Sequence, residues 1–268
     1  MDISHNTSQL RSLVLDIDRK CVSFMVHGGS EPVVTGTIAL DESMGNYLNA
    51  LENAIYDNPL LLDDYAGTTI AVHPPHFVLL PQELVDAGMA AKVLEASFST
   101  VDGTVLAHHI AGSTAAVACD IPRGVLAFLR RTFVGAVVMH HLVPLCGYCI
   151  GAYSEETGCM HISLDENSAH MVVVKQGELQ MANSFHYRAL EDVAYFALNM
   201  WKASALDSRH DKVLLSGDNS RRSSLAEQLR QWLPYVMPDV LPSSALKFGK
   251  DAISLPFNLL TLAIYENN

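Results

Sequence analysis

Two stretches of this chain decide its fold: SLVLDIDRKCVSFMVHGGSEPVVTGTIAL at 12–40 and HISLDENSAHMVVVKQGELQMANSF at 161–185. Each begins with an apolar strand that ends at an aspartate, Asp16 in the first copy and Asp165 in the second. A polar turn, a second apolar strand, a glycine-containing turn and a third strand follow in both copies, and the residue alternation is that of half-buried strands. The repeat predicts two related lobes that face each other across a cleft where a phosphate ligand would sit.

The composition bounds the class of protein. The chain has 268 residues, of which 49% are hydrophobic and 17% charged, enough for a large core in one or two domains. A net charge of −12 argues against nucleic acid or an anionic membrane surface as a partner. We expect no membrane span and no signal peptide, because no apolar run reaches about 18 residues and the chain starts with a polar segment. Five cysteines, an odd number, predict reduced thiols and a cytoplasmic location.

Helices are expected between and after the two repeats. Apolar residues at helical spacing predict helices over 43–56 and 190–204, and prolines are expected to start helices at 81–96 and 257–265. The stretch 246–248 is interpreted as an edge strand. Strands that alternate with helices in this way predict an α/β protein with mixed sheets.

In this order, the elements resemble the superfamily of actin, sugar kinases and heat-shock ATPases. Four segments carry the resemblance: LDID at 15–18 and LDENS at 164–168 (the two phosphate loops), VPLCGYCIGAY at 143–153 (the connecting helix) and LLSGDNS at 214–220 (the adenosine motif). The resemblance implies two ribonuclease-H-like lobes around a nucleotide cleft. It places the first lobe in residues 1–153 and the second in 154–268, with a C-terminal helix at about 256–265 packed back on the first lobe.

A narrower resemblance rests on PHFVLLPQELVDAGMAAKVLEASFS at 75–99, on VVMHH at 137–141 and on the connecting helix. These segments are similar to a family of uncharacterised bacterial proteins with an actin-like ATPase fold and no assigned function. They also resemble, more distantly, the pilus-assembly relatives of actin.

The first candidate phosphate loop departs from the pattern of the superfamily. Such a loop points backbone N–H groups at an anion, and glycine lets the backbone approach. Asp16 is kept, where the superfamily holds magnesium-bound water, but Asp18 replaces the glycine and Arg19 the hydroxyl residue. Asp18 adds negative charge where phosphate would lie, and Lys20 offsets part of it. The competing interpretation is that both aspartates are solvated residues at a strand end.

The second loop and the adenosine motif are closer to the pattern. Asp165 is kept, Asn167 replaces glycine and tolerates a left-handed backbone, and Ser168 supplies the hydroxyl. Only Gly217 remains of the adenosine glycine pair, and Ser216 and Asp218 flank it. The alternatives are an ordinary hairpin turn for the loop and a helix cap for Asp218 or Asn219.

The connecting helix lacks one chemical group and suggests another. Val143 stands where the superfamily has an acidic residue that could position water or metal. Cys146, Cys149, Cys159 and His161 are ligand types that zinc favours. The preferred interpretation is that the thiols are small buried residues in helix packing, with no metal bound.

Two functions from different classes remain open. Phosphoryl transfer depends on positioning and on charge stabilisation, which altered loops remove. The first hypothesis is therefore a catalytically degenerate binding or scaffold module, with no cofactor, with protein partners and with a homodimer as one assembly. The alternative is a magnesium-dependent ATPase or small-molecule kinase that binds ATP and Mg²⁺ in the cleft between the lobes.

Overall fold

The computed structural model describes residues 11–41, 43, 45–153, 157–241, 243–249 and 255–266. Two five-stranded sheets dominate it, in the orders β3-β2-β1-β4-β8 and β11-β10-β9-β12-β13. The strands of the first are β1 (Ser12–Ile17), β2 (Cys21–His27), β3 (Val34–Ala39), β4 (Gly67–Val72) and β8 (Val137–His140). Those of the second are β9 (Cys159–Leu164), β10 (Ser168–Lys175), β11 (Glu178–His186), β12 (Lys212–Gly217) and β13 (Val236–Pro238).

The two sheets are built alike. In the first, β1 pairs antiparallel with β2 and parallel with β4, and in the second β9 pairs antiparallel with β10 and parallel with β12. Both sheets begin with an antiparallel meander and then gain parallel strands through helical crossovers. The α/β class and the two-lobe arrangement predicted from the repeat are confirmed.

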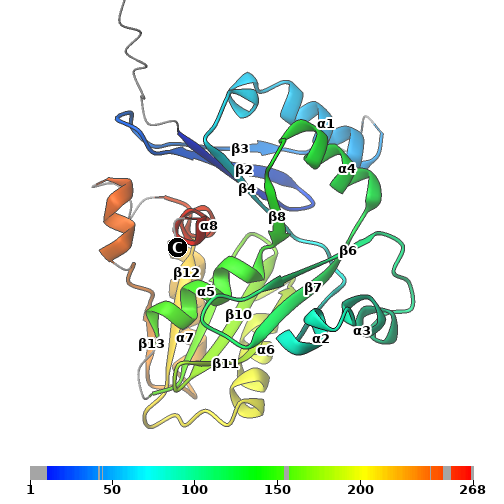
Figure 1. Cartoon of the computed structure of the whole chain (residues 1–268). Coiled ribbons are helices and arrows are strands. Elements are labelled where there is room, and N and C mark those ends of the chain that lie inside the picture. Colours follow the sequence, from blue (N-terminus) through cyan, green and yellow to red (C-terminus); the bar gives the residue numbers. More distant parts are fainter. Residues whose placement is uncertain are drawn as a thin grey trace, which may run out of the picture.

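Each sheet has two helices on its outer face. These are α1 (Tyr47–Tyr56) and α4 (Arg123–Thr132) on the first sheet, and α6 (Leu190–Ala203) and α7 (Asn219–Leu229) on the second (Figure 1). Alternate strand residues face these helices, so Leu13 and Leu15 of β1 pack with Leu51 of α1 in one fully buried core. Met171 and Val173 of β10 pack with α6 in the other.

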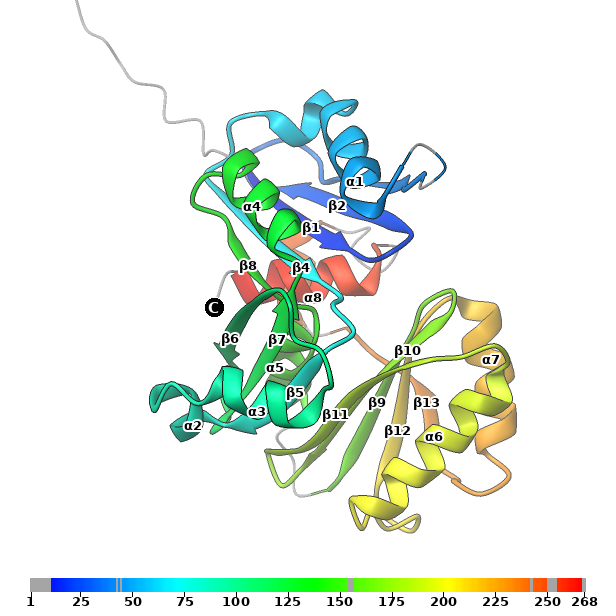
Figure 2. The same ribbon diagram turned by 90° about the vertical axis from the view of Figure 1, so that its right-hand side faces the viewer.

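Two further helices lie between the sheets. These are α5 (Leu142–Ala152), which carries the predicted connecting sequence, and α8 (Phe257–Glu266). Figure 2 shows α8 lying against the first sheet and next to α5, and it contacts β1, β2 and β4. Both helices share a core with the inward residues of both sheets, which include Val14 of β1 and Val172 of β10. This central core holds the two lobes together, whereas the lobe boundary at residues 153 and 154 stays a prediction.

A small third sheet lies beside the first five-stranded sheet and consists of β5 (Phe77–Pro81), β7 (Ala115–Ile121) and β6 (Thr104–His109). The single helix predicted over 81–96 is wrong, because α2 (Gln82–Asp86) and α3 (Ala90–Ser97) are separate. Gly88 between them has a φ of +70°, a left-handed turn that ends α2.

Other differences are local. Residues 246–248 belong to a 3₁₀ helix, η3 (Ser243–Phe248), rather than to an edge strand, and the second sheet has β11 and β13 at its edges. A second 3₁₀ turn, η2 (Pro59–Leu62), follows α1. Among the described residues, no helix combines the length and the apolar character needed to cross a membrane.

Candidate functional site

The first predicted loop follows β1, and the side chain of Asp18, a residue of this loop, occupies the position of the anion. The Asp18 carboxylate accepts hydrogen bonds from the backbone N–H groups of Lys20 and Cys21, both at 2.6 Å. These are the groups that a phosphate loop would point at its anion. The carboxylate therefore stands in for the phosphate, as in an ordinary Asx turn.

Asp16, the first aspartate of the predicted loop, faces the interior of the cleft near the end of β1. Its Oδ1 lies 2.7 Å from Nε2 of His73, which follows the neighbouring parallel strand β4. Its Oδ2 accepts a hydrogen bond from the Asn258 amide at the start of α8. Burial works against a charge on His73, but the Asp16 carboxylate outweighs it and raises the pKa of His73 above its ordinary value.

Asp165 repeats this arrangement in the second lobe. Its Oδ2 lies 2.8 Å from Nε2 of His170 on the antiparallel neighbour β10. Burial would raise the pKa of Asp165, but the hydrogen bond and charge of His170 lower it below its ordinary value. Its backbone carbonyl accepts hydrogen bonds from Tyr187 and Arg221 at 2.6 and 2.8 Å. Each lobe therefore contributes one aspartate–histidine pair to the cleft.

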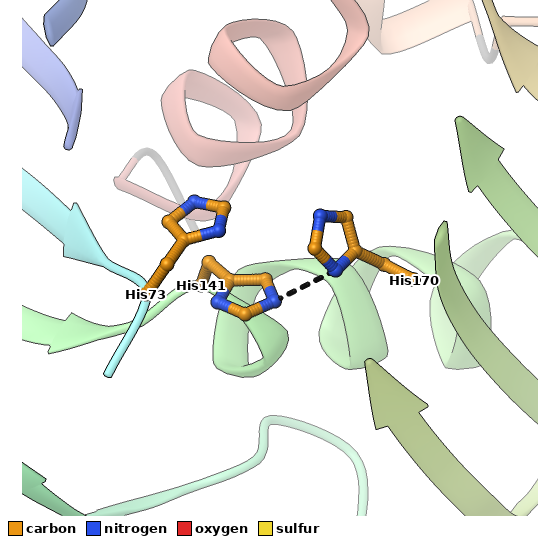
Figure 3. Close-up of side chains that lie close together, drawn as sticks. All are labelled: His73, His141 and His170. Atoms are coloured by element: carbon orange, nitrogen blue, oxygen red, sulfur yellow. Dashed lines mark hydrogen bonds between the residues drawn. The ribbon is translucent and has the colours of Figure 1, made fainter. Parts of the chain in front are cut away.

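His141, the residue before α5, joins the two pairs. Its ring stacks on that of His73 with 3.8 Å between centroids, and its Nε2 lies 3.0 Å from Nδ1 of His170 (Figure 3). The hydroxyl of Ser184 on β11 lies 3.0 Å from Nε2 of His141 and 2.9 Å from Nδ1 of His170. Burial lowers the pKa of His141 well below its ordinary value, and the nearby His73 lowers it further.

The space left between the lobes is small. A cavity of about 20 Å³ is lined by Asp16, His73, His141, Asp165, His170 and Asn258, together with apolar residues of α5 and α8. A cavity needs about 10–15 Å³ to hold one water molecule. The space between the two predicted loops therefore has room for about one water molecule or one ion.

The mouth of the cleft is bridged at the surface. The Lys20 ammonium lies 3.7 Å from the Glu166 carboxylate of the other lobe, and the Asn167 amide also faces Lys20. Lys20 and Glu166 are both exposed, so this pair adds little stability. Ser168 points elsewhere, because its hydroxyl lies 3.0 Å from the His186 ring.

A second, larger cavity of about 820 Å³ opens beside the adenosine motif. Four predicted residues line it: Asp165, Ser216, Gly217 and Asp218. The Asp218 carboxylate accepts from the backbone N–H of Arg221 at 3.0 Å and caps α7, as one alternative interpretation of the motif proposed. The buried Ser216 hydroxyl has no hydrogen-bond partner in the described part of the chain. Predicted residues Asp18, Lys20, Asn167 and Ser168 do not line this cavity.

The cysteine candidates lie elsewhere. Cys146 and Cys149 are fully buried on α5, and burial raises the pKa of both thiols, which disfavours the thiolate that zinc binds. Within the described ranges, the one group of side chains spaced to hold a metal ion is His73, His141 and His170, not the cysteines and His161.

Sequence reasoning missed the roles of His73, His170 and Asn258. His73 and Asn258 lie 57 and 242 positions from Asp16, so no short motif contains those pairs, whereas His170 lies only 5 positions after Asp165. The available signal was strand pairing, since His73 follows the parallel neighbour of β1 and His170 sits on the antiparallel neighbour of β9.

Solved structures share this fold. A Bacteroides thetaiotaomicron protein with an actin-like ATPase fold and unknown function has a TM-score of 0.79 and 18% identity to this chain. The match covers 97% of this chain and 99% of that protein's chain. A chain from a PilM–PilN type IV pilus biogenesis complex has a TM-score of 0.65 and 13% identity, covering 96% and 98%. Both predicted resemblances are thereby confirmed at the level of the fold.

At the level of sequence, no curated protein matches the chain. A family model described as "Protein of unknown function (DUF3822)" matches residues 2–236, which is most of the chain. With its actin-like fold and altered loops, the chain therefore belongs to the DUF3822 family, whose function is unknown.

Proposed function

We propose that this chain is a binding or scaffold module that keeps the actin-like architecture without turning over ATP. One observation carries the proposal: the space between the two loop aspartates is only about 20 Å³. A triphosphate with its magnesium is many times larger than the single water molecule that fits there. Nucleotide turnover in this cleft would require the lobes to separate and the contact between His141 and His170 to break.

The first loop supports the same proposal. Backbone N–H groups stabilise an anion only when they are free to point at it. Those of Lys20 and Cys21 already donate to the Asp18 carboxylate. A phosphate would have to displace this carboxylate and would then lie next to its negative charge, which disfavours binding.

The surface of the second lobe supports a role in binding protein. Val240 and Leu246 line the larger cavity and are 82% and 62% exposed. Clustered exposed apolar side chains of this kind mark surfaces that bind partners. The relative from the pilus complex is itself seen with a partner protein, PilN, which supports a protein partner here. We propose such a partner, or a second copy of this chain, in the cytoplasm, where five unpaired cysteines would stay reduced.

The alternative is an ATPase or kinase, and the larger cavity favours it. Ser216 and Gly217 line that cavity where the superfamily binds adenosine. Among the described residues that line it, the charged ones are mostly acidic, with Asp165, Asp218 and Asp239 against the single cation Arg222. This lining disfavours phosphates in the absence of bound Mg²⁺.

The test is calorimetric titration of the full chain with ATP and Mg²⁺, with Asp165→Ala as the matched variant. We expect no heat of binding at about millimolar ATP. This result would mean that the free energy of binding is weaker than about −4 kcal/mol. Magnesium-dependent ATP hydrolysis that Asp165→Ala abolishes would overturn the proposal and establish the alternative. Binding without hydrolysis, lost in the variant, would keep the binding module and make the nucleotide its ligand.

A further inference from the structure

Three histidines from three distant parts of the chain converge between the lobes. His73 follows β4 of the first lobe, His141 immediately precedes the connecting helix α5, and His170 lies on β10 of the second lobe. Each ring offers one nitrogen, and these three nitrogens lie within 4.8 Å of one another. Figure 3 shows His73 and His141 face to face, with His170 reaching toward them from the opposite sheet.

The far side of each ring has a hydrogen-bond acceptor. Nε2 of His73 meets the Asp16 carboxylate at 2.7 Å, and Nε2 of His170 meets the Asp165 carboxylate at 2.8 Å. Nδ1 of His141 faces the backbone carbonyl of Val72 at 3.4 Å. Histidines that bind metals characteristically donate their other N–H to a carboxylate or a carbonyl in this way.

These acceptors decide which nitrogens keep a lone pair. Carboxylates and carbonyls accept, and with the proton of each ring on its far nitrogen, Nε2 of His141 and Nδ1 of His170 both carry lone pairs. These two atoms are 3.0 Å apart, and the Ser184 hydroxyl between them has a single proton to share. Two lone pairs in contact repel each other, and a cation bound to both removes the repulsion.

The dimensions and the charge suit a metal ion. Zinc binds imidazole nitrogen at about 2.0–2.1 Å, which at a tetrahedral angle puts two such nitrogens about 3.4 Å apart. The observed 3.0 Å is within a few tenths of an ångström of this spacing. The adjoining cavity of about 20 Å³ admits one ion, and Asp16 and Asp165 supply two negative charges against its two positive ones.

One ring has to move. The planes of His73 and His141 are 8° from parallel, and in-plane lone pairs on parallel stacked rings do not point at a common atom. Binding through all three histidines therefore requires the His73 ring to tilt out of the stack. His73 follows the end of its strand, and its side chain is 14% exposed, the largest exposed fraction of the three rings.

We propose that His73, His141 and His170 form a binding site for one divalent transition metal ion, of which zinc is the best match, and that the ion joins the two lobes. Three imidazole ligands with oxygen-rich outer partners suit zinc better than magnesium or calcium, which prefer oxygen ligands. A fourth position remains for water. The site lies where the superfamily binds phosphate, so in this chain the ion replaces the nucleotide as the ligand that closes the cleft.

The test is titration of the chelator-treated full chain with zinc chloride, followed by calorimetry. We expect one zinc ion per chain for the wild type. We expect His170→Ala to bind more than about 100-fold more weakly, since loss of even an outer partner costs about 10–100-fold. His109→Ala is the matched control, because His109 pairs with Asp86 at the surface and lies outside the cluster. It should bind zinc like the wild type.

A second variant and a second readout keep the test decisive if His170→Ala does not fold. Asp165→Asn retains all three imidazoles and removes only the carboxylate behind His170, so we expect about 10–100-fold weaker zinc binding. Zinc should raise the thermal midpoint of the wild type and of His109→Ala, and raise it less in Asp165→Asn. Equal zinc affinity in wild type, His170→Ala and Asp165→Asn would overturn the proposal. So would an absence of binding, in which case His141 Nε2–H simply donates to His170.

Discussion

At the scale of single residues, Asp239 is a carboxylate that three side chains contact. It follows β13 and is 3% exposed at its side chain. It accepts hydrogen bonds from Tyr148 at 2.9 Å and Tyr153 at 2.6 Å, both from the connecting helix segment, and lies 3.3 Å from Nε2 of His161 on β9. Burial would raise the pKa of Asp239, but His161 and the two phenols outweigh it and lower that pKa.

The depressed pKa predicts an acid-dependent contribution to stability. A carboxylate whose folded pKa lies below its unfolded value of 3.8 contributes its full stability above that value. The contribution is lost as the pH falls through the folded pKa. We expect Asp239→Asn to cost about 2 kcal/mol at neutral pH, the scale of a charge-assisted hydrogen bond, and its deficit relative to wild type to shrink below pH 3.8. Urea unfolding at a series of pH values measures both.

The comparison isolates Asp239, because the other carboxylates titrate in both proteins. A free-energy difference between wild type and Asp239→Asn that stays constant across the acid range would contradict the prediction.

At the scale of elements, two glycines near the cleft have opposite roles. Gly217 ends β12 with a φ of +103°, and a Cβ there would overlap the carbonyl oxygen of Leu164 on β9. The glycine of the adenosine motif is therefore required by close strand packing, whether or not a nucleotide binds. Gly147 lies inside α5, and a Cβ there would make ordinary contacts with Tyr265 at 3.6 Å and Ala111 at 3.7 Å.

This contrast predicts opposite effects of the same substitution. Gly217→Ala should lower the free energy of unfolding by about 2 kcal/mol or more, through backbone strain and overlap. Gly147→Ala should raise it by up to about 1 kcal/mol, because alanine loses less entropy than glycine in a helix. Chemical denaturation of the two variants checks both signs. A stable Gly217→Ala would show that β12 and β9 can separate without cost.

At the scale of the whole molecule, α8 carries the last residues of the described chain into the central core. Leu259, Leu260 and Leu262 are fully buried against α5 and the inner face of the first sheet. Asn258 at the start of the same helix donates to Asp16 in the cleft. The helix thus couples the core that joins the lobes to the geometry of the candidate metal site.

The predicted consequence concerns global stability. Leu260→Ala should reduce the free energy of unfolding by about 2–5 kcal/mol through lost burial and a cavity. Leu246→Ala is the matched control, since Leu246 is 62% exposed and its loss should change stability by less than about 0.5 kcal/mol. Urea denaturation of both variants makes the measurement. Similar small losses in the two would mean that α8 is not part of the cooperative core.

The sequence by itself determined the α/β class, the two related lobes and the altered phosphate loops. Local sequence features suffice for these three conclusions. The strand–Asp–turn–strand pattern repeats at 12–40 and 161–185, and the sequence itself shows Asp18 in place of glycine. The sequence pattern did not predict the helix break at Gly88 or the 3₁₀ turn at 243–248. Backbone conformation at both places depends on packing that the pattern does not encode.

Only the tertiary structure decided what occupies the cleft. The contacts of Asp16 with His73 and with Asn258 span 57 and 242 positions, and they exist because parallel strand pairing and the return of α8 bring those residues to one edge. The same folding leaves a cavity of about 20 Å³ between the two aspartates. Residue type and spacing offered Cys146, Cys149, Cys159 and His161 as zinc candidates beside the preferred interpretation of buried thiols. The fold instead brought three histidines together, because a site depends on distances in space and not on distances along the chain.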